Sequence, residues 1–187
     1  MSVDTYGKIK GHISPEQIAQ TIRDKFGVEV TVDVHKHVHE KLDDLDWTFR
    51  NYGDSDYWWD EYGYIEFELS GEYRSLFYSY SNINTYENLD YYKNNFPDRP
   101  DLKEMVKSEK THIGLGCWGA SVRIIETIVS AFGGWVDDND CDDIPYRKIE
   151  RDTHFICDIT CEDNNPTHKT DCSTDAPIYR GMPEYDD

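Results

Sequence analysis

Three histidines alternate with other residues in the run His35-Lys36-His37-Val38-His39. Side chains two residues apart in a β-strand project from the same face, so a strand through this run would present all three imidazoles together. Three imidazoles can bind zinc, and Asp33 would lie on the same face as a further ligand or as a partner that orients one ring. The alternatives are an exposed polar strand edge, or a helix near Glu40 that keeps only His35 and His39 on one side.

A second set of potential metal ligands lies near the C-terminal end of the sequence. It consists of Cys157, Cys161, His168 and Cys172. Three thiolates and an imidazole can form a tetrahedral zinc site, which would order a segment that is poor in apolar residues. Incidental cysteines in an unstructured tail are the alternative. No cofactor is expected, although either of these two sets of residues could bind zinc. The five cysteines are an odd number at irregular spacings, which predicts reduced thiols and no disulfide framework.

The glycine-rich run Gly114-Leu115-Gly116-Cys117-Trp118-Gly119 has the spacing of a dinucleotide-binding loop. The residues before it are too polar for the buried first strand of such a fold, and Trp118 would crowd the turn. A glycine turn before a helix explains the pattern better. A further hypothesis is a nucleotide-signal-binding protein, in which this turn and Arg123 hold phosphate at a helix N-terminus.

Acidic and aromatic side chains are interleaved in residues 41–70, which contain nine carboxylates and two basic residues. Rigid rings surrounded by charge are typical of surfaces that bind another macromolecule. A second acidic group, in residues 137–143, lacks the glycine and the glutamate of a calcium loop and could instead face a basic partner. The predicted partner-binding residues are Asp43, Asp44, Asp46, Asp54, Asp56, Trp58, Trp59, Asp60, Glu61, Tyr62, Asp137, Asp138, Asp140, Asp142 and Asp143.

The charge of the whole sequence restricts the class of partner. Among 187 residues, 38 are acidic and 19 are basic, which gives a net charge of −19. Such a field repels nucleic-acid phosphates and anionic membranes, and it attracts basic proteins. Maintaining solubility is the alternative role of this charge. The sequence contains no apolar run of about 20 residues and no secretory signal pattern, which predicts a cytoplasmic protein.

The elements that must position these residues follow from hydrophobic periodicity. A strand over residues 6–11 precedes a helix with Ser14 as N-cap, Pro15 in its first turn and Gly27 as C-cap. Alternation predicts a strand over residues 28–34 and a hairpin of residues 64–69 and 76–80 that turns at Ser70-Gly71.

The second half of the chain begins with a long polar stretch. Residues 81–110 are predicted to form a loop with one short helix. A strand over residues 111–117 leads into a helix over residues 121–132, capped by Gly119 or Ser121, and short strands follow at residues 135–136 and 146–149.

This order predicts an α+β fold with a mainly antiparallel sheet and two principal helices packed on it. Residues 1–151 would form a single domain. Residues 152–187 would form a polar, acidic C-terminal tail that is either disordered or held by a metal.

Residues 112–148, which begin HIGLGCWGASVRIIETIV, resemble small acidic accessory proteins of tailed bacteriophages, a group with no common assigned activity. The resemblance implies a protein that acts in the cytoplasm of an infected bacterium as a host-takeover or anti-defence factor. It transfers no functional residues. The acidic and aromatic stretch is also similar in composition to DNA-mimic inhibitors.

The leading hypothesis is therefore a non-enzymatic inhibitor that binds a basic, nucleic-acid-handling host or defence protein by stoichiometric contact. No nucleophile with an evident base stands out, and a direct interaction with nucleic acid or membrane is not expected. The first alternative is a small metal-binding module or metal-dependent enzyme that uses His35, His37 and His39, and the second is the nucleotide-binding protein. The pattern predicts no particular oligomeric state.

Overall fold

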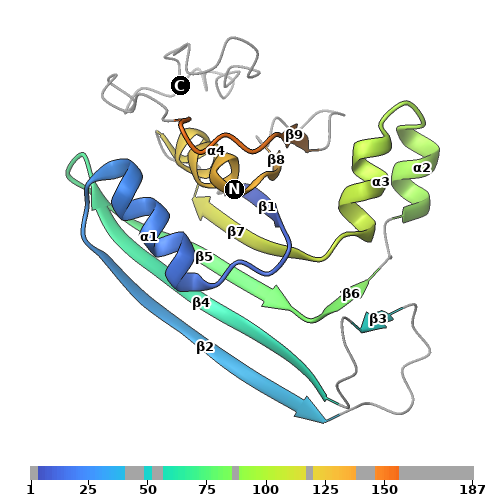
Figure 1. Cartoon of the computed structure of the whole chain (residues 1–187), viewed down its shortest axis with the longest axis horizontal. Helices are drawn as coiled ribbons and strands as arrows, with labels where there is room; N and C mark the ends of the chain where they lie inside the picture. The colour runs from blue at the N-terminus through green and yellow to red at the C-terminus, as the bar shows by residue number, and fades with distance from the viewer. Residues whose placement is uncertain are drawn as a thin grey trace, which may run out of the picture.

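The computed structural model describes residues 4–40, 49–51, 57–85, 89–116, 120–137 and 146–155. Within them, an antiparallel sheet has the strand order β2-β4-β5-β7-β1-β8-β9, and a separate pair is formed by β3 and β6 (Figure 1). The strands are β1 (Asp4–Lys10), β2 (Val30–Glu40), β3 (Phe49–Asn51), β4 (Tyr57–Leu69), β5 (Glu72–Ser81), β6 (Ile83–Thr85), β7 (Lys110–Gly116), β8 (Gly134–Asp137) and β9 (Arg147–Ile149). The helices are α1 (Pro15–Phe26), α2 (Leu89–Asn95), α3 (Pro100–Lys107) and α4 (Ser121–Phe132). The predicted α+β class is confirmed.

Helix α1 begins and ends at the residues that the sequence indicates. The Ser14 side chain accepts a hydrogen bond from the Gln17 backbone N–H, and the Gln17 side chain accepts one from the Ser14 N–H. This reciprocal pair satisfies two donors that a helix N-terminus otherwise leaves unpaired. Gly27 ends the helix at φ 67°, a left-handed conformation that glycine adopts without a Cβ clash.

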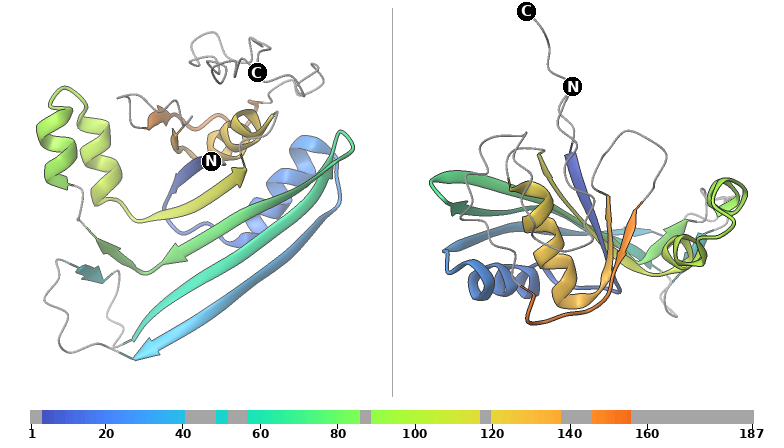
Figure 2. Two further views of the ribbon diagram at one scale, coloured as in Figure 1. Left: turned by 180° about the vertical axis from the view of Figure 1, so that it is seen from behind. Right: turned by 90° about the horizontal axis from the view of Figure 1, so that it is seen from above.

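The two principal helices cover one face of the sheet, which we call the inner face. Helix α1 lies against β2 and β4, while α4 lies against β1, β7 and β8. Figure 2 shows both helices on the same side. Ile18 and Ile22 of α1 and Ile124, Ile125 and Ile128 of α4 are fully buried. They pack on inner-face residues of the sheet to form the main core: Ile9, Ile65, Leu76, Ile113 and Val136.

Helix α4 differs from the prediction at its start. Its N-cap is Ala120, which makes no side-chain capping hydrogen bond, and Ser121 instead donates to the Gly116 carbonyl oxygen. The serine therefore ties the helix to the end of β7. Most of the helix is buried, including Glu126, whose carboxylate pairs with the Arg147 guanidinium of β9 at 3.1 Å.

The polar stretch between β5 and β7 is more ordered than the sequence predicts. The prediction of a loop with one short helix is wrong, because the segment contains strand β6 and the antiparallel helices α2 and α3. Leu102, Met105 and Val106 of α3 pack with Tyr92 of α2 around Trp135 of β8. This small second core lies on the outer face of the sheet, because Trp135 alternates with the inner-face residues Gly134 and Val136.

Strand β2 is longer than predicted and begins two residues later. It runs through all three histidines to Glu40, so the alternative of a helix near Glu40 is wrong. The hairpin of β4 and β5 turns at Ser70 and Gly71 as predicted, and the short strands β8 and β9 are confirmed. No helix in the described ranges is long and apolar enough to cross a bilayer.

Candidate binding surface on the open sheet face

The cross-strand register sorts the residues of β2, β4 and β5 onto two faces. Ile65 and Phe67 point to the core, so their neighbours in sequence point to the outer face. The outer positions of these three strands are Thr31, Asp33, His35, His37 and His39; Trp58, Asp60, Tyr62, Tyr64, Glu66 and Glu68; and Tyr73, Ser75, Phe77, Ser79 and Ser81. We call this surface the open face.

The open face has a distinctive composition. Its sixteen positions carry four carboxylates, five large aromatic rings and three imidazoles, and no lysine or arginine. On the inner face of the same strands, Ile65, Phe67 and Leu76 belong to the main core. The interleaved acids and rings of the sequence are thus gathered by strand alternation, with the acids beside the rings.

Three rings of the open face are accessible to solvent. Tyr62 is 50% exposed, Tyr64 is 49% exposed and Tyr73 is 66% exposed. Tyr64 meets Phe77 edge to face, with 6.0 Å between the ring centroids. A hydrogen bond to Glu66 raises the pKa of Tyr73. Exposed aromatic residues gathered in this way mark a macromolecular contact surface more often than a solvated one.

The three histidines share the open face, as the alternation predicts, and each has a different neighbour. His37 stacks on Tyr62 with 4.7 Å between ring centroids, and His39 stacks on Trp58 at 3.7 Å. His35 is largely exposed and lies 3.1 Å from the Asp33 carboxylate, so Asp33 orients this ring. Among the residues that the structure describes, no three His, Cys, Asp or Glu side chains lie close enough to hold a metal ion as they stand.

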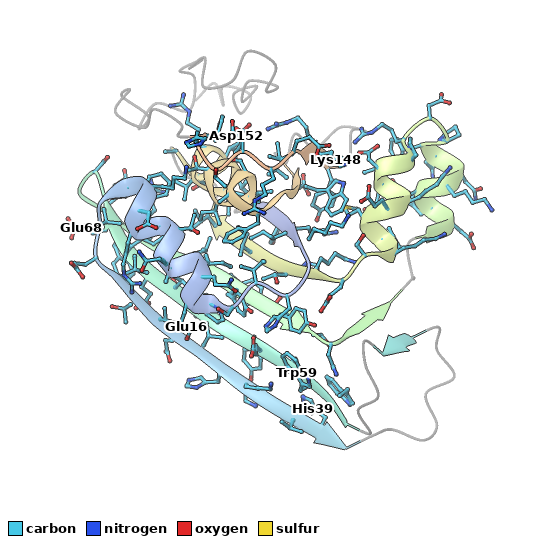
Figure 3. The ribbon with its side chains drawn as sticks, in the orientation of Figure 1. Glu16, His39, Trp59, Glu68, Lys148 and Asp152 are labelled. Carbon is cyan, nitrogen blue, oxygen red and sulfur yellow. The ribbon has the colours of Figure 1, made fainter. Side chains whose placement is uncertain are left out.

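Strand alternation also divides the predicted partner-binding residues between two faces. Trp58, Asp60 and Tyr62 lie on the open face, whereas Trp59 and Glu61 point to the inner face. The Lys36 ammonium lies 3.5 Å from the centroid of the Trp59 ring, in a cation–π contact within the protein. His39 and Trp59 are both at the end of the β2–β4 pair that is distant from Glu68 (Figure 3).

A polar cluster that the sequence analysis missed surrounds Glu61 on the inner face. Glu61 Oε2 lies 3.0 Å from His12 Nε2 and accepts a hydrogen bond from the Tyr78 hydroxyl at 3.1 Å. The Tyr78 hydroxyl also lies 3.0 Å from the Ile13 carbonyl oxygen. Burial, followed by the charge of Glu61, raises the pKa of Tyr78. The cluster holds the segment before α1 against β4 and β5, and its imidazole–carboxylate pair is capable of proton transfer.

Aromatic rings enclose the imidazole of this cluster. The His12 ring lies 4.1 Å from the Tyr80 ring and 5.4 Å from the Trp59 ring, centroid to centroid. The Tyr80 hydroxyl donates to the Glu109 carboxylate. These residues come from four separate segments, so no local motif marks them. The sequence gives one signal for this cluster, the alternating pattern of β5, which places Tyr78 and Tyr80 on the core side.

Three basic side chains meet on the outer face of β1 and β7, in contrast to the open face. Lys8 is directly opposite His112, and Lys110 is the diagonal neighbour of Lys8. Burial lowers the pKa of both Lys8 and Lys110 to about 8, with Asp137 opposing the shift at Lys8. Lys110 also donates to the carbonyl oxygens of Val106 and Ser108, which anchors the end of α3.

The remaining predicted site residues are only partly described. Asp137 lies at the end of β8, half-buried. Arg123, which the nucleotide-binding hypothesis uses to hold phosphate, is buried in α4. Strand β7 is antiparallel to both its neighbours, which contradicts the parallel first strand of a dinucleotide-binding fold. The other predicted residues lie outside the described ranges: Asp43, Asp44, Asp46, Asp54, Asp56, Asp138, Asp140, Asp142, Asp143, Cys157, Cys161, His168 and Cys172.

Comparison of the chain with protein-family models, curated proteins and solved structures gave no match.

Proposed function

We propose that this chain is a non-enzymatic binding protein whose open face docks on a basic partner protein. The observation that carries the proposal is the composition of the face, which combines four carboxylates, five large rings and three imidazoles with no lysine or arginine. Exposed rings supply contact area at a low cost in conformational entropy, while the carboxylates select a partner of opposite charge.

A basic partner also fits the chain as a whole. The net charge of −19 accelerates encounter with positively charged proteins and slows encounter with free nucleic acid. Proteins that hold nucleic acid carry such positive surfaces, and carboxylates placed on a rigid sheet can occupy them in place of phosphates. The chain would then act as a stoichiometric inhibitor that mimics nucleic acid.

The phage context supports the same role. The resemblance of residues 112–148 to accessory proteins of tailed bacteriophages favours a host or defence protein in an infected bacterium as the target. Under this proposal the protein acts in the bacterial cytoplasm, and its activity is occupancy of the target's nucleic-acid site.

The test uses the full chain as bait in a bacterial lysate and then measures affinity for the purified partner. One variant removes rings (Tyr62→Ala with Tyr64→Ala), and another removes charge (Glu66→Gln with Glu68→Gln). Loss of a central aromatic anchor should cost about 2 kcal/mol, which weakens binding about thirtyfold. Affinity of the unmodified chain should also fall steeply between about 50 and 200 mM salt if carboxylates imitate phosphates.

Matched controls lie elsewhere on the molecule. Tyr91→Ala removes a ring of α2 that is 56% exposed, and Glu150→Gln removes an exposed carboxylate next to β9. Both controls should bind like the unmodified chain. If the controls weaken binding as much as the open-face variants do, the partner docks elsewhere, and salt-independent affinity would contradict mimicry of nucleic acid.

A further inference from the structure

At one end of the open face, His37, His39 and Asp60 have buried polar atoms without hydrogen-bond partners, which partner binding does not explain. His37 is directly opposite Asp60 in the β2–β4 register, and His39 is opposite Trp58. The Asp60 carboxylate is therefore the cross-strand neighbour of one imidazole and the diagonal neighbour of the other. Directly opposed residues of this kind have Cβ atoms about 5 Å apart.

Three ligand-type atoms at this position are buried without a hydrogen-bond partner. They are Nε2 of His37, Nε2 of His39 and Oδ1 of Asp60. A buried polar atom without a partner is unfavourable, so three such atoms on neighbouring residues favour a ligand that pairs with them. His39 Nε2 and Asp60 Oδ2 lie 3.3 Å apart, within ion-pair distance but without the geometry of a hydrogen bond, so one nitrogen and one carboxylate are already close together.

We propose that His37, His39 and Asp60 form a binding site for a divalent first-row transition ion, with zinc as the representative metal. Two imidazole nitrogens and one carboxylate are a ligand set that zinc and ferrous iron use in proteins. The ion would provide the missing partner of all three buried atoms. Three protein ligands leave coordination positions for water or for a group of a bound partner.

Binding requires one side-chain movement. His37 now lies flat on Tyr62, with 12° between the ring planes, and its ring must turn toward Asp60 to complete the site. The strand backbone already fixes His37 opposite Asp60, so rotation about side-chain bonds is sufficient. The exchange of a ring contact for a metal bond is favourable, since a single ring contact is weak.

The site differs from the set that the sequence predicts. His35 is two residues farther from this end of the strand, its side chain is 71% exposed, and its neighbour is Asp33. The structure replaces His35 by Asp60 as the third ligand. His35 is therefore a matched control, because it is a histidine of the same strand and the same face.

The test is calorimetric titration of zinc into the full-length, untagged protein after chelator treatment. One ion should bind per chain at this site. His37→Ala, His39→Ala and Asp60→Asn should each weaken that binding at least about tenfold, and His35→Ala should leave it unchanged. Melting curves of the metal-free variants should match that of the unmodified chain, which separates loss of a ligand from loss of the fold.

Other outcomes would overturn the site. Equal weakening by His35→Ala and His37→Ala would point instead to a site made by His35, His37 and His39 together. Loss of binding in Cys161→Ala, with His37→Ala unaffected, would place the metal at the C-terminal cysteines. Absence of binding at micromolar zinc would end the proposal. Partner capture measured in chelator is a separate readout, so the metal site and the proposed function can fail independently.

Discussion

At the scale of single residues, His112 links the outer face of β7 to the pH dependence of stability. Burial, together with the charges of Lys8 and Lys110, lowers its pKa to about 3. The unfolded chain binds this proton below about pH 6.5, whereas the folded chain remains unprotonated until about pH 3. The unfolded state thus binds more protons throughout this window. Stability is therefore fully present above the unfolded pKa and is lost as the pH falls toward 3.

We expect His112→Gln to reduce the acid sensitivity of the protein. The difference in slope between the two proteins should approach about 1.4 kcal/mol per pH unit within the window from 6.5 to 3. Urea unfolding at a series of pH values measures these slopes. His35→Gln is the control, because it makes the same change at a largely exposed position of β2. Parallel curves for the unmodified chain and His112→Gln would contradict the prediction.

At the scale of elements, the contact between β2 and β4 depends on Gly63. A Cβ at this position would lie 2.1 Å from the Asp33 carbonyl oxygen and 2.8 Å from the Val34 Cα, and both atoms belong to the backbone of β2. No side-chain rotation can relieve such a clash, so the two strands would have to separate. The glycine has φ 156°, a value that side chains also disfavour.

Gly63→Ala should therefore destabilise the fold by about 3 kcal/mol, at the upper end of the usual overpacking cost. The midpoint of urea unfolding measures the change. Gly114→Ala is the matched control, because its Cβ would meet the Tyr6 ring at 3.0 Å, and that ring can move. The control should cost clearly less. Equal losses of stability in the two variants would mean that the close approach of β2 and β4 does not explain the glycine at position 63.

The sequence predicts well the elements whose signals are local. The Ser14 cap, the Gly27 terminus and the turn at Ser70-Gly71 each act within a few residues, and all three were predicted correctly. The sequence predicts only one short helix where α2 and α3 lie, because the stability of this pair depends on Trp135, which lies well beyond them in sequence. Polar composition alone did not reveal that Leu102, Met105 and Val106 form one apolar side.

The candidate sites also divide into features that one strand determines and features that depend on contacts between distant segments. Alternation predicts that the three histidines share a face, since that property belongs to one strand. The opposition of His37 and Asp60 depends on the register between β2 and β4, which are not joined by a tight turn. The His12–Glu61–Tyr78 cluster depends on three segments. Long-range register of this kind is not encoded in any local pattern.

At the scale of the whole molecule, the excess of acidic residues acts against the folded state. Folding brings like charges together, and their repulsion is screened by salt. Raising sodium chloride from about 0.01 to 0.1 M shortens the screening length from about 30 Å to about 10 Å. We expect the melting temperature to rise by at least about 2 °C, which corresponds to a gain of ~1 kcal/mol for a chain of this size.

A less acidic variant tests the cause of this effect. Glu29→Lys with Asp98→Lys changes two exposed positions and reduces the net charge from −19 to −15. Its melting temperature in low salt should be higher than that of the unmodified chain, and its response to salt should be smaller. A melting temperature that is constant or falls with salt would show that local ion pairs outweigh the general repulsion.

The position of β1 between β7 and β8 has a consequence for how the protein is made. The Thr111 hydroxyl of β7 binds the carbonyl oxygen of Gly11 across 100 residues of chain. During translation, the first strand leaves the ribosome long before either of its neighbours exists. The hairpin of β4 and β5 can form early, whereas the middle of the sheet closes only after the strand that follows α4 has been synthesised. Final assembly is thus a late event in which the N-terminal strand is inserted between two newly made ones, and such distant pairings fold slowly.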